Sequence, residues 1–173
     1  EGEWMKNKLG EIAKFSKGKG IAKDDIDEKG EIECIRYGEL YTHYKEVIGE
    51  IKSRTSLGRS ALVFSDVDDV IIPSSGETQI DIATASCVLR SGIALGGDLN
   101  IVKTKNNGVF LSFYLNSRKK KEIANLAQGI SVVHLYSSQL SLLEINTPKA
   151  KEQDRIAKFL TIISDRIVAQ NKI

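Results

Sequence analysis

Two acidic segments flank one short apolar run, and their composition is that of a magnesium-dependent nuclease site. "DVDD" (66–69) leads into the run "VIIP", and "ETQ" (77–79) follows it closely. Carboxylates at such a spacing can hold magnesium, and a lysine beside them would assist the attacking water. Gln79 stands where that lysine is needed, so turns and helix caps are the simpler interpretation of these acids. A nuclease that uses Asp68 and Glu77 is kept as an alternative function.

Other catalytic patterns are weak. Ser117 and Lys120 form an SxxK pair without the companion motifs of an acyl-transfer enzyme. "GKG" (18–20) lacks the third glycine of a dinucleotide-binding loop. His43 and His134 are isolated, which is typical of structural or contact residues. No loop of the Asn-Pro-Pro-Tyr type is present to hold a flipped adenine. The sequence therefore predicts no catalytic residue, no metal site and no cofactor.

Three polar loops instead carry side chains suited to reading nucleic acid. Glutamine can bond adenine and arginine or lysine can bond guanine, while serine and backbone amides hold phosphates. The candidates are Arg36, Tyr37, Tyr41, His43 and Lys45 in the first loop, Ser75, Thr78 and Gln79 in the second, and Gln128, Ser131, His134, Tyr136 and Ser138 in the third.

The charges are distributed unevenly, although the net charge is only +2. Residues 24–33 hold six acids and one lysine, whereas residues 99–121 hold six basic residues and no acid. Such an uneven distribution of charge suits a protein that binds a polyanion on one side of its surface. The predicted phosphate ligands are Lys17, Lys19, Lys103 and Lys105. For "SRKKK" (117–121) a solvated helix face is an equally good interpretation.

The composition is that of an ordinary globular protein. The chain has 173 residues, of which 41% are hydrophobic and 28% charged, and it contains no apolar run of the roughly 20 residues that span a bilayer. Cys34 and Cys87 lack the spacing of a disulfide framework or zinc site, so we expect buried thiols and a cytoplasmic location.

The elements that must position the loops are short strands and a few helices. Runs at 32–37, 61–64 and 69–77 have strand character, and two further strands are expected around Gly96 and Gly97. Residues 109–126 have helical periodicity, and 129–145 return to a strand, a polar turn and an extended run. The pattern predicts an α+β fold with a mixed, mostly antiparallel twisted sheet.

The last predicted element is an amphipathic helix from about residue 148. Thr147 is its expected cap and Pro148 its first turn. Its apolar stripe consists of Ile156, Phe159, Leu160, Ile163 and Ile167. A helix of this length is marginal alone in water, so the stripe should pack on a partner helix. That helix could belong to another copy, another part of the chain or a different subunit; the alternative is that it folds back on its own domain.

The sequence resembles the specificity subunit of type I restriction-modification systems. The resemblance is carried by "WMKNKLGEIAKFSKGKG", by "IRYGELY" and "VIIPSSGET", and by the closing half from "GGDLNIVKTKNNGVFLSFYLNS" to "EINTPKAKEQDRIAKFL". It covers residues 4–173, and the closing segment is the most specific part.

The resemblance implies a protein that reads DNA without chemistry of its own. A full subunit has two target recognition domains, each reading half of a bipartite site, separated by two antiparallel helices. Modification subunits dock on it and methylate adenine with S-adenosylmethionine, and restriction subunits join through them. Here we expect a recognition domain at 1–147 and a protruding coiled-coil spacer or dimerisation helix at 148–173. The third function considered is an assembly protein that dimerises through its last helix and binds no DNA.

The sequence departs from that pattern in having one recognition domain and one helix. It is expected to be either a half-length subunit that pairs with a copy of itself or the C-terminal half of a longer chain. The missing methionine and the "EGEW" start favour the second interpretation.

Overall fold

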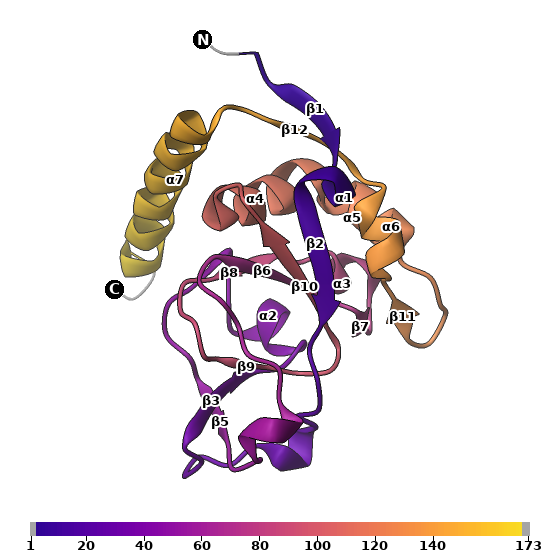
Figure 1. Ribbon diagram of the computed structural model, residues 1–173, viewed down its shortest axis with the longest axis vertical. Helices are drawn as coiled ribbons and strands as arrows, with labels where there is room; N and C mark the ends of the chain where they lie inside the picture. The colour runs from indigo at the N-terminus through magenta and orange to yellow at the C-terminus, as the bar shows by residue number, and fades with distance from the viewer. Residues whose placement is uncertain (1–2, 171–173) are drawn as a thin grey trace.

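A five-stranded sheet forms the centre of the molecule. The computed structural model describes residues 3–170 (Figure 1). The strand order is β2-β10-β6-β8-β4, with every neighbouring pair antiparallel except β4 and β8. The strands are β2 (Ala13–Lys17), β10 (Leu99–Thr104), β6 (Asp69–Pro73), β8 (Ser86–Val88) and β4 (Val47–Ile48).

The central strand β6 is buried along its whole length, which explains its unbroken apolar run. Successive side chains of a strand point to opposite faces, so the sheet separates two cores. Val70 and Ile72 pack in a core under the helices, whereas Ile71 and Ile101 pack in a second core on the other face.

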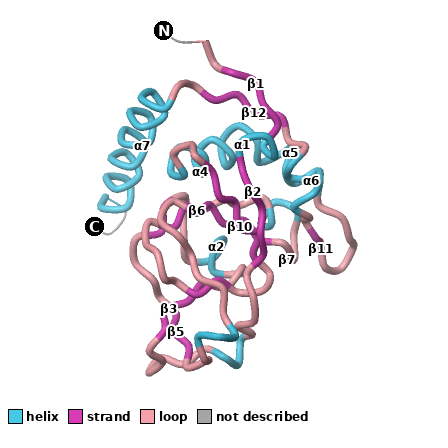
Figure 2. Tube along the Cα trace, in the orientation of Figure 1, coloured by secondary structure: helices cyan, strands magenta, loops and turns pink. Residues whose placement is uncertain are grey.

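Helices cover the face of the sheet that carries Val70 and Ile72 (Figure 2). The longest stretch is α4 (Gly108–Tyr114), a π-helical turn (Leu115–Lys119) and α5 (Lys120–Leu126). Asn107 caps α4 by accepting a hydrogen bond from the Phe110 amide (2.8 Å). A Cβ at Gly108 would lie 2.3 Å from the Asp68 carbonyl oxygen, so only glycine allows α4 to approach the sheet this closely. The remaining short helices are α1 (Leu9–Ile12), α2 (Glu39–Thr42), α3 (Gln79–Ile82) and α6 (Ser137–Ser141).

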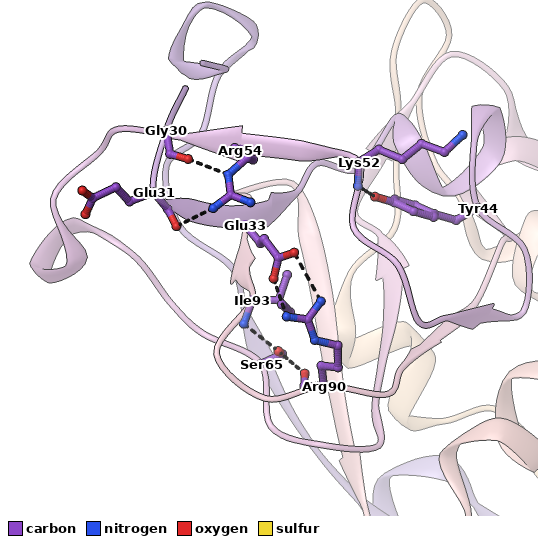
Figure 3. A network of polar contacts seen from close by, with 9 residues as sticks. All are labelled: Gly30, Glu31, Glu33, Tyr44, Lys52, Arg54, Ser65, Arg90 and Ile93. Carbon is purple, nitrogen blue, oxygen red and sulfur yellow. Dashed lines mark hydrogen bonds and ion pairs between the residues drawn. The ribbon is translucent and has the colours of Figure 1, made fainter. Parts of the chain in front are cut away.

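A smaller sheet of order β5-β3-β9 lies beyond the second core. Its strands are β3 (Ile32–Ile35), β5 (Ser53–Thr55) and β9 (Ala94–Leu95). Figure 3 shows the polar contacts that hold it: the Arg54 guanidinium donates to the carbonyl oxygens of Gly30 and Glu31, and Arg90 pairs with Glu33. Short 3-10 turns at Lys23–Asp25 and Arg59–Ala61 complete this end of the molecule.

Two strand pairs join distant parts of the chain. β1 (Met5–Lys8) pairs with β12 (Glu144–Thr147), and β7 (Ser75–Gly76) pairs with β11 (Val133–His134). The first pair binds the start of the described chain to the segment that enters the last helix.

The last helix, α7 (Ala150–Gln170), runs along one side of the body beside α4 (Figure 1). Its first turns are fixed by Gln153, whose side chain is buried. The Gln153 amide donates to the Pro148 carbonyl oxygen (2.8 Å) and to Asn106 Oδ1 (2.6 Å), and its carbonyl oxygen accepts from the Asn107 amide (3.0 Å). Within residues 3–170, no helix combines the length and apolarity needed to cross a bilayer.

The predicted α+β class and the long final helix are confirmed, and most predicted elements have counterparts. The strand predicted at 61–64 is wrong: Ala61 ends a 3-10 turn, and only Phe64 forms a bridge, to Ala94. The predicted cap is also wrong, because Thr147 ends β12 and α7 begins at Ala150. The polar turn predicted between the two late strands is helix α6.

Replacing Gln153 with alanine should loosen α7 from the body. The change leaves the Asn107 amide and the Pro148 carbonyl oxygen without their side-chain partner, so we expect the free energy of unfolding to fall by about 2 kcal/mol in a urea titration. Gln170→Ala, at the exposed end of the same helix, should change it by less than about 0.5 kcal/mol. Equal effects of the two substitutions would contradict this account of the junction.

Candidate nucleic-acid interface

Several strands end at one edge of the molecule and bring distant turns together. Lys17 at the end of β2 pairs with Asn100, and Pro73 at the end of β6 pairs with Leu99. The Gly96 amide donates to the Ile35 carbonyl oxygen (2.9 Å) at the end of β3. We call this surface the loop edge; it consists of residues 17–20, 35–38, 73–79, 96–98 and 127–136.

Backbone hydrogen bonds connect these turns to one another. The Gly97 amide donates to the Gly20 carbonyl oxygen (2.8 Å), and the Ser74 amide donates to that of Asp98 (2.8 Å). Ile21, directly after Gly20, is buried and has a φ of 62°, a strained value for a β-branched residue. The surrounding structure therefore imposes the conformation of this turn.

Residues 127–135 form a projecting hairpin loop, which we call the finger. Gln128 and His134 exchange backbone hydrogen bonds of 2.9 and 2.7 Å, and this single bridge closes the loop. Its returning strand pairs with β7, and the Leu135 amide donates to the Ser74 carbonyl oxygen (3.0 Å). The finger is thus built onto the end of the central sheet.

Asn100 fastens the finger to the sheet from within. Its side chain has no exposed area. Nδ2 donates to the carbonyl oxygen of Leu135 (2.9 Å) and more weakly to that of Pro73 (3.5 Å). Among the described residues its Oδ1 has no hydrogen-bond partner. A buried amide in an apolar strand is costly unless it is bonded, so this residue has a positioning role.

The second predicted loop lies at the edge but uses most of its side chains internally. Ser75 is buried in β7. The Thr78 hydroxyl accepts from the Asp81 amide (3.1 Å) as the cap of α3 and donates to the Asp81 carboxylate (2.6 Å). The Gln79 amide nitrogen lies 3.5 Å from the Ala127 carbonyl oxygen. Their predicted base contacts stay predictions.

The third predicted loop presents its side chains to solvent. Gln128, Ser131, His134, Tyr136 and Ser138 are all exposed. The rings of His134 and Tyr136 stack with their centroids 6.4 Å apart. Of the three predicted loops, this one leaves the most hydrogen-bonding groups available for a ligand.

The first predicted loop is divided between two surfaces. Arg36 lies against Gly96 at the loop edge, and Tyr37 packs near Tyr41 with ring centroids 6.4 Å apart. Burial, helped by Tyr37 and the carboxylates of Glu77 and Asp81, raises the pKa of Tyr41. The structure does not bring His43 and Lys45 to the loop edge, because both line a hollow facing α7.

Tyr44, beside them, is structural. Its hydroxyl oxygen accepts a hydrogen bond from the Lys52 amide (3.0 Å; Figure 3). Burial raises the pKa of Tyr44 to about 12, so its phenol stays protonated across the physiological range.

The predicted lysines separate into two groups. Lys17 and Lys19 are exposed at the loop edge, and neither takes part in an ion pair with another described residue. Lys103 and Lys105 lie toward the opposite end of β10. There the backbone of Lys103 lies opposite that of Lys14 in the β10–β2 strand pair. The structure therefore does not bring all four lysines together at the loop edge, and their phosphate contacts stay predictions.

Lys103 also has carboxylate partners already. Its ammonium contacts Asp66 and lies 3.3 Å from Asp69. The hydrogen bond to Asp66 raises the pKa of Lys103, and burial raises the pKa of Asp69. A phosphate at this position would have to compete with both acids.

The two carboxylates of the nuclease alternative are not placed to hold one ion. The Asp68 carboxylate lies against the Cys87 thiol (3.4 Å) and the Gly108 amide (3.3 Å). Glu77 lies beyond the other end of β6. Within the described part of the chain, no three His, Cys, Asp or Glu side chains form a group that could bind a metal.

The predicted helix stripe faces two environments. Ile156 packs against the main core of its own body. Phe159 is 63% exposed, Ile163 and Ile167 are also exposed, and Leu160 is half-buried. Leu160, Ile163 and Ile167 border a hollow between α7 and the body. Their pairing with another helix stays a prediction.

The sequence analysis did not identify three residues that form or support the loop edge. Asn100 was visible as one amide within the apolar strand "LNIV", and Gly129 and Ile130 lie in a stretch, 123–143, without any charged residue. A long uncharged segment in a chain that is 28% charged was the available signal.

The chain has relatives among known families and structures. The family model for the type I restriction modification DNA specificity domain matches residues 1–173. No curated protein matches the chain in sequence.

Three similar solved structures share the fold at low sequence identity. The S subunit of a type I restriction-modification system from M. genitalium has a TM-score of 0.71 and 18% identity, over 99% of this chain and 41% of that chain. The HsdS subunit from Thermoanaerobacter tengcongensis has a TM-score of 0.65 and 15% identity, over 98% and 39%. A chain from a study of the assembly and conformational transition of the type I R-M system has a TM-score of 0.69 and 16% identity, over 98% and 40%.

Replacing Asn100 with leucine, whose side chain has the same number of heavy atoms, should loosen the finger. Loss of the hydrogen bond leaves the Leu135 carbonyl oxygen unpaired, so we expect the free energy of unfolding to fall by about 1–3 kcal/mol. Hydrogen exchange in residues 128–135 should become faster in the folded protein. Asn125→Leu, an exposed position on α5, is the matched control and should change neither quantity. Unchanged exchange in the finger of Asn100→Leu would contradict the positioning role.

Proposed function

The chain belongs to the family of type I restriction modification DNA specificity domains, and from this premise we propose that its loop edge reads one half of a bipartite double-stranded DNA site. The observation that carries the proposal is the convergence of five separate turns on one edge, with exposed lysines at one turn and exposed hydrogen-bonding groups on the finger. The chain spans about 40% of the length of the similar solved structures, in keeping with one half of a site.

The charges at the loop edge favour a division of contacts. Lys17 and Lys19 attract and position phosphates, which gives a salt-dependent affinity without sequence preference. The uncharged finger and the neighbouring turns supply contacts to base edges. Lys103 has no part in this division because Asp66 and Asp69 already neutralise it.

We further propose that the chain itself performs no chemistry. In this account residues 1–147 form the recognition domain and the helix from 148 onward is a spacer. Methylation and cleavage belong to modification and restriction subunits that assemble around it, and a cytoplasmic location follows from the DNA that it reads. The exposed apolar face around Phe159 packs on an equivalent helix of a second copy or of a longer parent chain.

Selection of duplexes from a random DNA pool, with the modification subunits present, tests the central proposal. We expect a short consensus for the half-site read by this chain. The affinity for that site should fall steeply between low and moderate salt. Recovery of sequences without a consensus, or an affinity that does not change with salt, would contradict it.

The double substitution Lys17→Ala, Lys19→Ala tests the role of the loop edge within that assay. If each lysine neutralises one phosphate, the slope of log K against log salt should decrease in magnitude by about 2, with the consensus unchanged. The measurement is fluorescence anisotropy over a salt series. Lys105→Ala, an exposed lysine at the other end of β10, should leave the slope unchanged. A smaller slope for Lys105→Ala with an unchanged slope for the double substitution would contradict the proposal and would indicate an interface near Lys103.

The helix face is tested by Phe159→Glu. We expect the isolated chain to self-associate, and a glutamate in the paired face should weaken association at least about tenfold, since burial of a phenylalanine side chain contributes about 1.5–3 kcal/mol. Sedimentation equilibrium gives the constant. Leu142→Glu places the same charge at an exposed leucine outside the helix and is the control. A monomeric wild-type chain at all concentrations, or an equal effect of the control, would contradict helix pairing.

A further inference from the structure

The tip of the finger carries an isoleucine that no part of the described chain covers. Ile130 is 99% exposed, and Val132 beside it is half exposed. Isolated exposed apolar residues are common on protein surfaces. This one lies at the tip of a projecting loop whose base is fixed by hydrogen bonds.

The turn that leads to Ile130 requires a glycine. Gly129 has a φ of 129°, a region that L side chains rarely adopt. A Cβ at Gly129 would lie 2.1 Å from the Val132 carbonyl oxygen. The base of the finger is held by the Asn100 amide, and the Gln139 side-chain amide donates to the Leu126 carbonyl oxygen (2.8 Å) just before it. The base of the finger, from which Ile130 projects, is therefore preorganised.

The charge pattern indicates which part of a duplex the finger meets. Residues 123–143 contain no Lys, Arg, Asp or Glu. Cations supply the long-range attraction to phosphates, and the loop edge provides them at Lys17 and Lys19, next to the strand that carries Asn100. The uncharged finger, with polar groups at Gln128, Ser131 and His134, is suited to the interior of a DNA groove.

The widths of the two DNA grooves indicate which one the finger can enter, and the base edges exposed there indicate what Ile130 can contact. The finger is a hairpin loop of two adjacent chain segments closed by one bridge. Two adjacent segments fit the major groove, about 12 Å wide and able to admit a two-stranded ribbon, more easily than the minor groove, about 6 Å wide. In the major groove the apolar group of the base edges is the C5-methyl group of thymine. Resting on the proposed function, we propose that the finger enters the major groove and that Ile130 is a specificity-determining residue that packs on the methyl group of one thymine.

The test compares thymine with deoxyuridine, which lacks only the methyl group. After selection of the consensus, each thymine of the half-site is replaced in turn, and affinity is measured for the wild-type chain in its complex with modification subunits. We expect a loss of about 3- to 10-fold at one position. Ile130→Ala should bind the thymine site more weakly by a similar factor and should respond to deoxyuridine at that position by less than twofold.

Controls separate this inference from the proposed function. Leu142→Ala, an equally apolar change at a 64% exposed residue outside the loop edge, should keep the wild-type response to deoxyuridine. Thermal unfolding should show that Ile130→Ala folds normally, since its side chain contacts solvent.

Each outcome has one meaning. If the wild-type chain selects no sequence, the proposed function fails. If it selects a consensus but Ile130→Ala keeps the wild-type affinity and deoxyuridine response, only the inference is overturned. If Ile130→Ala weakens binding to thymine and deoxyuridine sites alike, the contact is with the base stack and the assignment to the methyl group is wrong. An effect confined to subunit assembly would make Ile130 a protein contact and would also overturn it.

Discussion

The hydrogen bond from the buried Asn100 amide to the Leu135 carbonyl oxygen joins the finger to the centre of the main sheet. Asn100 lies on β10 between the ends of β2 and β6, so one side chain links segments that are far apart in sequence. A buried amide would be destabilising in an apolar strand without such partners. Together with the pairing of β11 and β7, this contact sets the position of the finger on the loop edge.

The antiparallel sheet gives the molecule two chemically different ends. At one end β6 finishes, β10 begins and β2 delivers Lys17 and Lys19 without carboxylate partners among the described residues. At the other end Lys103 is held by Asp66 and Asp69, and α4 closes over Asp68 through the close approach at Gly108. Similar residue types are therefore available to a ligand at one end and engaged within the fold at the other. Proximity to acids, rather than the density of basic residues along the chain, determines which lysines stay available.

The sequence predicted the fold class well but only part of the site. Local patterns were sufficient for β6, for the helical region after Asn107 and for α7, because each has a clear period or a buried run. Pairing between distant segments was not readable, and it alone separates Lys17 from Lys103 and turns Lys45 toward α7. Thr78 and Gln79 have the right side chains for base contacts, yet their hydrogen bonds lie within the molecule. Side-chain type indicates what a residue can bind, whereas the partners already present decide what remains free.

Hydrogen exchange of the whole chain, with its modification subunits, in the absence and presence of the selected duplex tests the central claim most directly. The account predicts that DNA slows amide exchange at residues 17–20, 74–79, 96–98 and 127–136 together, because these turns form one surface. It also predicts no change at residues 66–69 and 103–105, at the opposite end of the sheet. Slower exchange at 66–69 and 103–105 with an unaffected finger would contradict it.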